Sequence, residues 1–427
     1  MNLSERTQNL LRFGYVSALV AWIVGFQCFL VKLTFAGRLL FYRGPDGVHF
    51  TDFVVFYNWW RIGATELKQR LYDPQVQLQF LSELLGPLQK SQLPYIQGTP
   101  FFFLLGSPLA HLSLQAAFLT WNLFTIGFFL MGYLRCLSVF SPAGARRKLF
   151  FLATAMASFP FLSCERDGQT GALLSGIVGM YCFFWLKQKQ LMAGLVMSTL
   201  VIKPQYLPFL LLAPVAFRRW KVLLGFLGGV LLHSVLSWRA LGSEVLLNYP
   251  SLLLSAEANS EGYLGIFTSW MVCLRGVLIY VFSEKISLLI SFAICFAALT
   301  ALFCLATIVR KKADLKLEAQ FLSLLILSSV IFSPHTFAYD LQLLSISAAL
   351  GWYCFPELQP WRKLWNSCFF AYPLIGMAYF IIMDKIQQGW LAAPFHLLPN
   401  LLLLVCSIFL IRAGIKNNNP AEAQEAI

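Results

Sequence analysis

The chain has 427 residues, of which 58% are hydrophobic and only 12% are charged, with a formal net charge of +13 at pH 7. Soluble domains are about 45–50% apolar and about 25% charged, so this composition excludes an ordinary soluble domain and indicates an integral membrane protein. The basic residues form short clusters between apolar runs, at 146–148, 218–221 and 310–312, which is typical of cytoplasmic loops and argues against a nucleic-acid-binding surface.

The apolar segments, taken in chain order, predict the membrane topology. A helix needs about 20 apolar residues to cross the hydrocarbon. Candidates lie at 13–34, 114–136, 149–163, 169–186, 221–236, 286–309, 317–333, 338–354, 364–383 and 391–412. Residues 191–217 lie between two basic clusters and contain Lys203 followed by Pro204, so we predict two short helices that turn near Lys203. The fold class is therefore an all-α polytopic membrane protein with about 12 transmembrane helices and both termini in the cytoplasm.

Two further apolar segments, 99–112 and 264–282, would move basic clusters to the wrong side if they crossed the membrane. We predict that both are re-entrant or interfacial helices on the outer side. Residues 35–98 then form a large first outer loop that carries short interfacial helices, including an amphipathic one at 67–89. The chain is predicted to be a single membrane domain over 1–415, followed by a disordered cytoplasmic tail (416–427).

Candidate catalytic groups gather on the outer side of this topology. Asp52 lies in the aromatic stretch HFTDFVVFYNWW (49–60), whose Trp and Tyr side chains we expect at the bilayer interface. Other ionisable groups come from CERDGQ (164–169), from Lys203 and from SPHTFAYD (333–340). Ionisable residues at membrane depth are costly and tend to be functional.

These residue types suit the transfer of a group from a phosphate leaving group. A carboxylate such as Asp52 can take a proton from an attacking hydroxyl. Cationic side chains such as Lys203 and Arg166 can stabilise the charge of a departing phosphate in a site of low dielectric. No paired ligands indicate a bound metal, the ten cysteines are scattered singly, and no cofactor is expected.

Each of these groups also fits a structural role, and the residues alone leave the choice open. The alternatives are a helix cap for Asp52, a self-compensating exposed turn for 165–167, snorkelling to the interface for Lys203 and solvation at a helix end for His335. The small residues at every fourth position in 171–179 are typical of close helix packing and carry no functional prediction.

Four stretches of the chain resemble, in order, the family-87 glycosyltransferases of the GT-C superfamily. They are TDFVVFYNWWRIGATELKQRLYDP (51–74), TPFFFLLGSPLAHLSLQAAFLTWNL (99–123), the Gly-Gln, Lys-Pro-Gln and Arg-Arg-Trp segments within 167–221, and SPHTFAYDLQLL (333–344). The resemblance implies a GT-C-like helix bundle. It also implies an integral membrane enzyme that takes a sugar, expected to be mannose, from a polyprenyl phosphate donor.

The resemblance implies roles for individual residues. Asp52 matches the aspartate of the first outer loop, which implies a catalytic base and inversion of configuration. Lys203 and His335 match the lysine of the broken hairpin and the histidine of the late outer loop, both near the donor phosphate, to which we add Arg166. Further residues expected to line the substrate cavity are Gln169, Tyr57, Tyr339 and Glu165. The nearest match to the family's Asn-containing run in the third outer loop holds Asn259 and Ser260.

We therefore predict a hexosyltransferase that acts on an envelope lipid or glycan acceptor at the outer face of a bacterial inner membrane. A transporter or flippase for a lipid-linked sugar is the alternative, because a broken helix pair near Lys203 fits a midplane transport site. No internal repeat is visible, which favours the enzyme. A non-catalytic subunit of a polysaccharide complex is a third reading.

Overall fold

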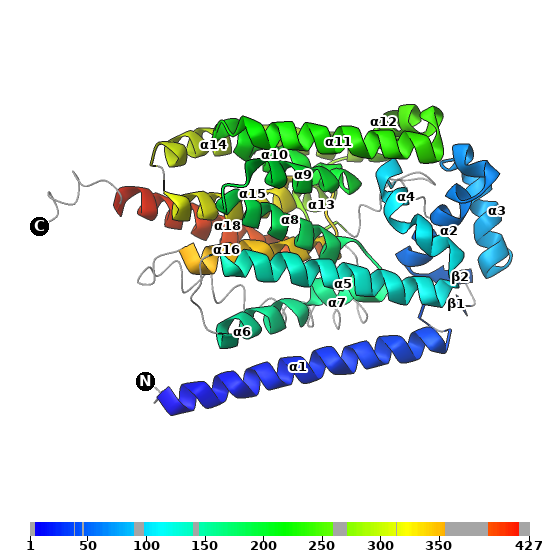
Figure 1. The fold of residues 1–427 in the computed structure, drawn as a ribbon, viewed down its shortest axis with the longest axis horizontal. Coiled ribbons are helices and arrows are strands. Elements are labelled where there is room, and N and C mark those ends of the chain that lie inside the picture. The colour runs from blue at the N-terminus through cyan, green and yellow to red at the C-terminus, as the bar shows by residue number, and fades with distance from the viewer. Residues whose placement is uncertain are drawn as a thin grey trace, which may run out of the picture.

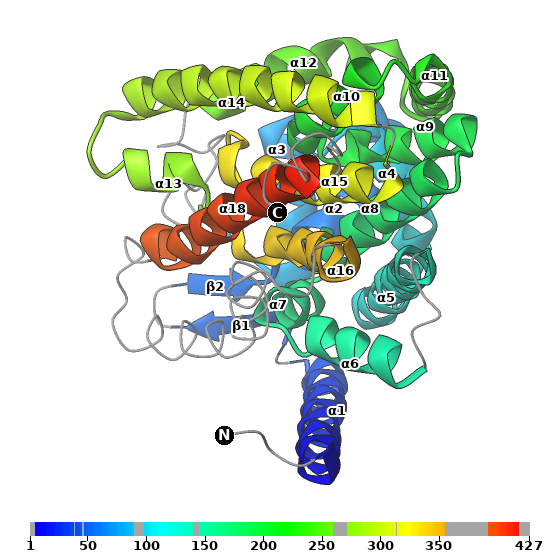
Figure 2. The ribbon, with the colours of Figure 1, turned by 90° about the vertical axis from the view of Figure 1, so that its left-hand side faces the viewer.

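The computed structural model describes residues 5–37, 39–44, 47–88, 98–139, 145–258, 271–312, 314–354 and 392–417. These residues form a bundle of helices, most of which run along one long direction (Figure 1). The N-terminal end of helix α1 (Glu5–Phe35) and the C-terminal end of helix α18 (Ala392–Asn417) lie at one end of the bundle. Helix α1 lies at the edge of the bundle, next to helix α6 (Ala145–Met156), in both views (Figures 1 and 2).

Five helices of the described chain are long and apolar enough to cross a membrane. They are the Phe13–Phe35 part of α1, α5 (Leu114–Ser138), α11 (Trp220–Leu241), α14 (Glu284–Lys312) and α15 (Leu315–Phe332). Shorter apolar helical segments cover Gly171–Leu186 (α8), Gln190–Ile202, Pro204–Ala216 and Leu397–Ala413. The prediction of an α-helical membrane protein is confirmed. The count of about 12 spans stays a prediction, and the segment 364–383 lies outside the described residues.

Two predicted spans are not single α-helices. The segment 149–163 is divided between α6 and α7 (Phe159–Asp167), because Ser158 has extended backbone and Pro160 fits only the first turn of a new helix. The segment 338–354 begins as a 3₁₀ helix, η7 (Ala338–Leu343), and continues as α16 (Leu344–Cys354).

The predicted break at Lys203 is confirmed. Helix α9 (Gln190–Ser198) tightens into η4 (Thr199–Ile202), and η5 (Pro204–Tyr206) leads into α10 (Leu207–Ala216). Lys203 itself has φ −138° and ψ 81°, because a residue before proline is disfavoured in the helical region.

The first loop contains more regular structure than expected. Strands β1 (Phe41–Gly44) and β2 (Gly47–Phe50) pair antiparallel and lead into α2 (Asp52–Gly63). The amphipathic stretch is not one helix: η1 (Glu66–Arg70) is followed by α3 (Pro74–Leu85), whose first turn is capped by the Asp73 carboxylate accepting from the Gln75 amide at 2.8 Å. The hairpin corrects the purely helical prediction. These elements gather at the end of the bundle opposite the two termini (Figure 1).

The two segments predicted not to span are short helices where they are described. Residues 99–112 form α4 (Pro100–Gly106) and η3 (Ser107–His111), and 264–282 contains α13 (Leu274–Leu278), with 259–270 outside the described residues. Each is far shorter than the hydrocarbon is thick.

Most aromatic side chains of α2 are packed inside the protein, which corrects the expectation that they lie exposed at a bilayer interface. Phe53, Trp59 and Trp60 are at most 1% exposed. The Trp60 ring lies 5.2 Å from the Trp121 ring of α5, and the Phe53 ring lies 5.2 Å from the Phe118 ring. These rings anchor α2 on the bundle and fix the position of its first residue, Asp52.

Helices α5 and α8 approach each other closely through glycines. A Cβ atom added at Gly132 or at Gly176 would overlap the backbone of the opposite helix. One added at Gly179 would lie 2.7 Å from the Gly132 carbonyl carbon. The small residues of 171–179 therefore serve helix packing, as predicted. Gly171 at the start of α8 similarly lies against the Tyr339 carbonyl of η7, so α8 supports the segment that carries Asp340.

The ends of α8, α11 and α15 are joined by a mostly buried ion pair. The Arg219 guanidinium donates to the Glu318 carboxylate at 2.6 Å, and the Trp185 indole donates to the same oxygen at 3.0 Å. The guanidinium also lies 4.1 Å from the Trp185 ring centroid. The side chains of the pair are only 10% and 12% exposed.

We expect Glu318→Ala to lower the free energy of unfolding by about 3–5 kcal/mol, because it leaves the Arg219 charge buried without its partner. Denaturant unfolding in detergent measures this change. The control is Glu83→Ala, since Glu83 is 49% exposed and lies 3.8 Å from Arg61; its expected effect is below about 1 kcal/mol. Equal effects of the two substitutions would contradict the stabilising role of the Arg219 pair.

Candidate functional site

Asp52 is the first residue of α2, and its carboxylate accepts a hydrogen bond from the Gln169 side-chain amide. The N-cap position belongs to Thr51, whose amide donates to the Leu40 carbonyl at 2.9 Å. Asp52 is therefore not the cap of α2. Its bond to Gln169 joins the first loop to the turn after α7, 117 positions along the chain.

The environment of Asp52 raises its pKa to about 6. Asp52 is exposed at the protein surface, but many protein atoms lie near its carboxylate, and the resulting desolvation is the largest cause of the shift. The negative charge of Asp167 adds to it. The Gln169 hydrogen bond and the positive charges of Lys203 and Arg166 act in the opposite direction. A carboxyl group with this pKa is suited to accept and release a proton near neutral pH.

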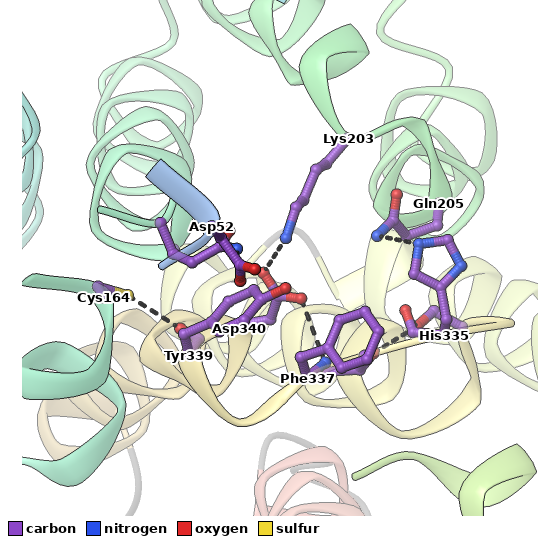
Figure 3. A network of polar contacts seen from close by, with 12 residues as sticks. Asp52, Cys164, Lys203, Gln205, His335, Phe337, Tyr339 and Asp340 are labelled. Atoms are coloured by element: carbon purple, nitrogen blue, oxygen red, sulfur yellow. Dashed lines mark hydrogen bonds and ion pairs between the residues drawn. The ribbon is translucent and has the colours of Figure 1, made fainter. Parts of the chain in front are cut away.

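Lys203 is directed at η7. Its ammonium lies 2.6 Å from an Asp340 carboxylate oxygen and 4.7 Å from the centroid of the Tyr339 ring (Figure 3). The Lys203 side chain is 18% exposed and the Asp340 side chain is fully buried. The ammonium is thus held in a mostly buried ion pair and does not simply extend to an interface.

His335 is partly buried and lies beside the same broken helix pair. Its Nε2 atom is 3.0 Å from the side-chain nitrogen of Gln205. The backbone after His335 is fixed by the Val272 amide, which donates to the Thr336 carbonyl at 2.7 Å. Lys203 and Gln205 of KPQY (203–206) thus contact two residues of SPHTFAYD at separate points (Figure 3).

The CERDGQ turn is partly self-compensating. Two nitrogens of the Arg166 guanidinium donate to the two Asp167 carboxylate oxygens, each at 2.8 Å. Gly168 has φ 66° and ψ 31°, a left-handed conformation that ends α7. The main-chain amide of Gln169 then donates to the Cys164 carbonyl at 2.9 Å. The turn thereby places the side-chain amide of Gln169 at the Asp52 carboxylate.

Glu165 is not an exposed turn residue. It is fully buried, and neither of its carboxyl oxygens has a hydrogen-bond partner among the described residues. Burial raises its pKa well above the ordinary value, which favours the neutral acid. Its main-chain carbonyl accepts from the Asn122 side chain at 2.8 Å.

The two predicted tyrosines have different surroundings. The Tyr57 hydroxyl donates to the Leu112 carbonyl at 2.6 Å, and its ring packs against the Phe53 ring. No described contact joins Tyr57 to the polar cluster, which consists of Asp52, Arg166, Gln169, Lys203 and His335. Tyr339 lies within the cluster, under the Lys203 ammonium. Its carbonyl accepts from the Cys164 thiol at 3.3 Å.

Sequence reasoning gave no role to two residues that the structure joins to the cluster. Asp340 binds Lys203, and Gln205 contacts His335. Both belong to short polar motifs beside a predicted site residue, which is the signal that could have identified them. Asn259 and Ser260 lie outside the described residues. In the described ranges, no group of three His, Cys, Asp or Glu side chains could hold a metal ion.

The fold and the site define an α-helical membrane protein in which a carboxylate of raised pKa lies among cationic side chains. Residues 97–334, more than half of the chain, match glycosyltransferase family 87. The chain belongs to this family and is a glycosyltransferase. The matched range includes Lys203 and the CERDGQ turn, whereas Asp52 precedes it and His335 follows it directly. No curated protein and no solved structure matches the chain.

Proposed function

We propose that the protein is a GT-C-type hexosyltransferase that uses a polyprenyl-phosphate-linked sugar, with mannose as the expected sugar. The acceptor is an envelope lipid or glycan, and transfer takes place at the outer face of the bacterial cell membrane. The observation that carries this proposal is the placement of Asp52, with a pKa near 6, beside the positive charges of Lys203 and Arg166.

In the proposed reaction, the base acts on the attacking hydroxyl and the cations act on the leaving phosphate. Asp52 takes the proton of the acceptor hydroxyl as its oxygen forms a bond to the anomeric carbon. The bond from that carbon to the phosphate oxygen breaks, and its electron pair leaves with the phosphate. Lys203, helped by Arg166 and His335, stabilises the negative charge on the leaving group. Attack from the face opposite the phosphate inverts the configuration.

The remaining proposed site residues differ in how they support this reaction. Gln169 orients Asp52 by its hydrogen bond, and Tyr339 lies under the Lys203 ammonium. Tyr57 and Glu165 stay proposed as cavity residues. Both are buried, which suits a supporting role in the wall better than direct contact with a substrate.

Reconstituted vesicles that contain a polyprenyl-phosphate-linked sugar and an acceptor test the proposal against the transporter alternative. We expect polyprenyl phosphate to be released in proportion to the sugar transferred. A transporter would move the lipid-linked sugar across the bilayer and leave the sugar–phosphate bond intact. Movement without release would contradict the enzyme, and neither activity in the isolated protein would favour a non-catalytic subunit.

A further inference from the structure

The proposed reaction leaves one buried acid of the cluster without a role. Asp340 is fully buried in η7, yet both of its carboxylate oxygens are engaged. Oδ1 accepts from the Lys203 ammonium at 2.6 Å, and Oδ2 accepts from the Phe337 amide at 3.3 Å. A backbone amide therefore fixes the carboxylate that receives the lysine (Figure 3). A buried carboxylate is costly unless it is paired in this way.

Two consecutive residues of η7 hold the Lys203 ammonium. Asp340 supplies the ion pair, and the Tyr339 ring supplies a face 4.7 Å from the nitrogen. The other end of the side chain is fixed too, because the Lys203 amide donates to the Leu200 carbonyl at 2.9 Å and Pro204 follows. The charge is thus preorganised at one place, which is how fixed cations contribute most to a charged transition state.

The same arrangement keeps Lys203 from neutralising Asp52. The positive charge of Lys203 acts on Asp52, yet among the described ion pairs its partner is Asp340 and not Asp52. Without Asp340, the flexible lysine would be free to pair with Asp52, and a carboxylate paired with an ammonium is a weaker base.

We propose that Asp340 is a positioning residue, which holds the Lys203 ammonium on the Tyr339 ring, in reach of the donor phosphate and out of an ion pair with Asp52. The phosphate part of this inference rests on the proposed function. The hold on Lys203 does not, because it concerns two residues of the ligand-free protein.

The proposal predicts a change in the pH profile when Asp340 is replaced by asparagine. Asp52 is faced by Arg166 and Asp167 from the end of α7, by Lys203 and by Tyr339 from η7. Loss of the Asp340 charge leaves Lys203 free to favour the ionised form of Asp52. The acid limb of kcat/KM therefore moves to lower pH, by about one unit, while kcat falls. A merely structural defect would lower the amount of active enzyme without moving the limb.

The reactivity of the Lys203 amine provides a test that needs no substrate. The full-length protein in detergent is treated with trace acetic anhydride, and mass spectrometry compares acetylation of Lys203 with that of the exposed Lys187. We expect Asp340→Asn to raise the relative rate of acetylation at Lys203 several-fold, because an ammonium released from the fully buried Asp340 carboxylate is more accessible to the reagent. The matched control is Asp167→Asn, which removes a carboxylate paired with Arg166 and should leave Lys203 unchanged.

The two readouts separate the failure of this inference from that of the proposed function. If the wild-type protein transfers no sugar but Asp340→Asn exposes Lys203, the proposed function is wrong and the hold on Lys203 stands. If the wild type transfers sugar while Asp340→Asn changes neither Lys203 reactivity nor the acid limb, the positioning role is wrong. Should the asparagine variant not fold, Asp340→Glu keeps the charge but displaces the ammonium. We then expect the wild-type acid limb with a lower kcat, and an unchanged kcat would overturn the inference.

Discussion

Asp52→Asn is expected to reduce kcat/KM for sugar transfer by about 10³-fold or more while the protein still folds. The asparagine side chain keeps an oxygen that can accept from the Gln169 amide, so the link between the first loop and the turn after α7 is retained. The same oxygen cannot take a proton from an acceptor hydroxyl. Transfer of a radiolabelled sugar from its polyprenyl phosphate donor measures the loss, and thermal unfolding in detergent checks the fold.

The control for this substitution lies in the same loop. Asp73→Asn alters an aspartate that caps α3 and pairs with Arg70, so we expect near-wild-type transfer. Full activity of Asp52→Asn would remove Asp52 from the reaction. The wild-type profile gives a second check, because a base must be deprotonated to act. With a pKa of about 6, Asp52 becomes protonated as the pH falls through 6, and kcat/KM should decline below that value.

Local chemistry explains what the sequence predicted correctly about the site. The break at Lys203 follows from the proline after it, and the turn at Gly168 follows from a glycine between polar residues. The contacts that make the site are not local. Gln169 contacts Asp52, 117 positions away, and Lys203 contacts Asp340, 137 positions away. The spacing of these residues in the sequence therefore does not predict the two contacts.

Asp340 shows why a contact of the candidate site can be overlooked in the sequence. Its carboxylate accepts from the Phe337 amide three residues earlier, which is the ordinary capping role of an aspartate at a helix start. That role accounts for the residue locally and hides the second bond, to Lys203, which only the tertiary structure supplies.

The errors in the first loop have two different causes. The aromatic residues of α2 have the composition of an interfacial belt, but packing against α4 and α5 buries them, and composition does not distinguish the two environments. The hairpin of β1 and β2, in contrast, could have been predicted. Its sequence RGPDGV (43–48) contains Pro-Asp-Gly, a combination that favours turns, between residues that favour strands.

The second large effect is expected at Lys203, and the structure decides how it should be measured. Lys203→Ala alone would leave the Asp340 charge buried without its partner, at a cost to stability of about 3–5 kcal/mol. A loss of activity in that variant would then not distinguish chemistry from unfolding. Lys203→Met combined with Asp340→Asn removes both charges and keeps the side-chain volumes close, so the fold should be largely retained.

In this double variant we expect kcat to fall by about 10²–10³-fold, because the cation that we propose stabilises the leaving phosphate is gone. Donor KM should rise as well, since the same charge attracts the phosphate in the ground state. Lys187→Met, at an exposed lysine, serves as the control and should leave both constants unchanged. If the double variant keeps the wild-type kcat and donor KM, Lys203 acts only as the structural partner of Asp340. The phosphate must then be stabilised from elsewhere, with Arg166 and His335 as the next cations to replace.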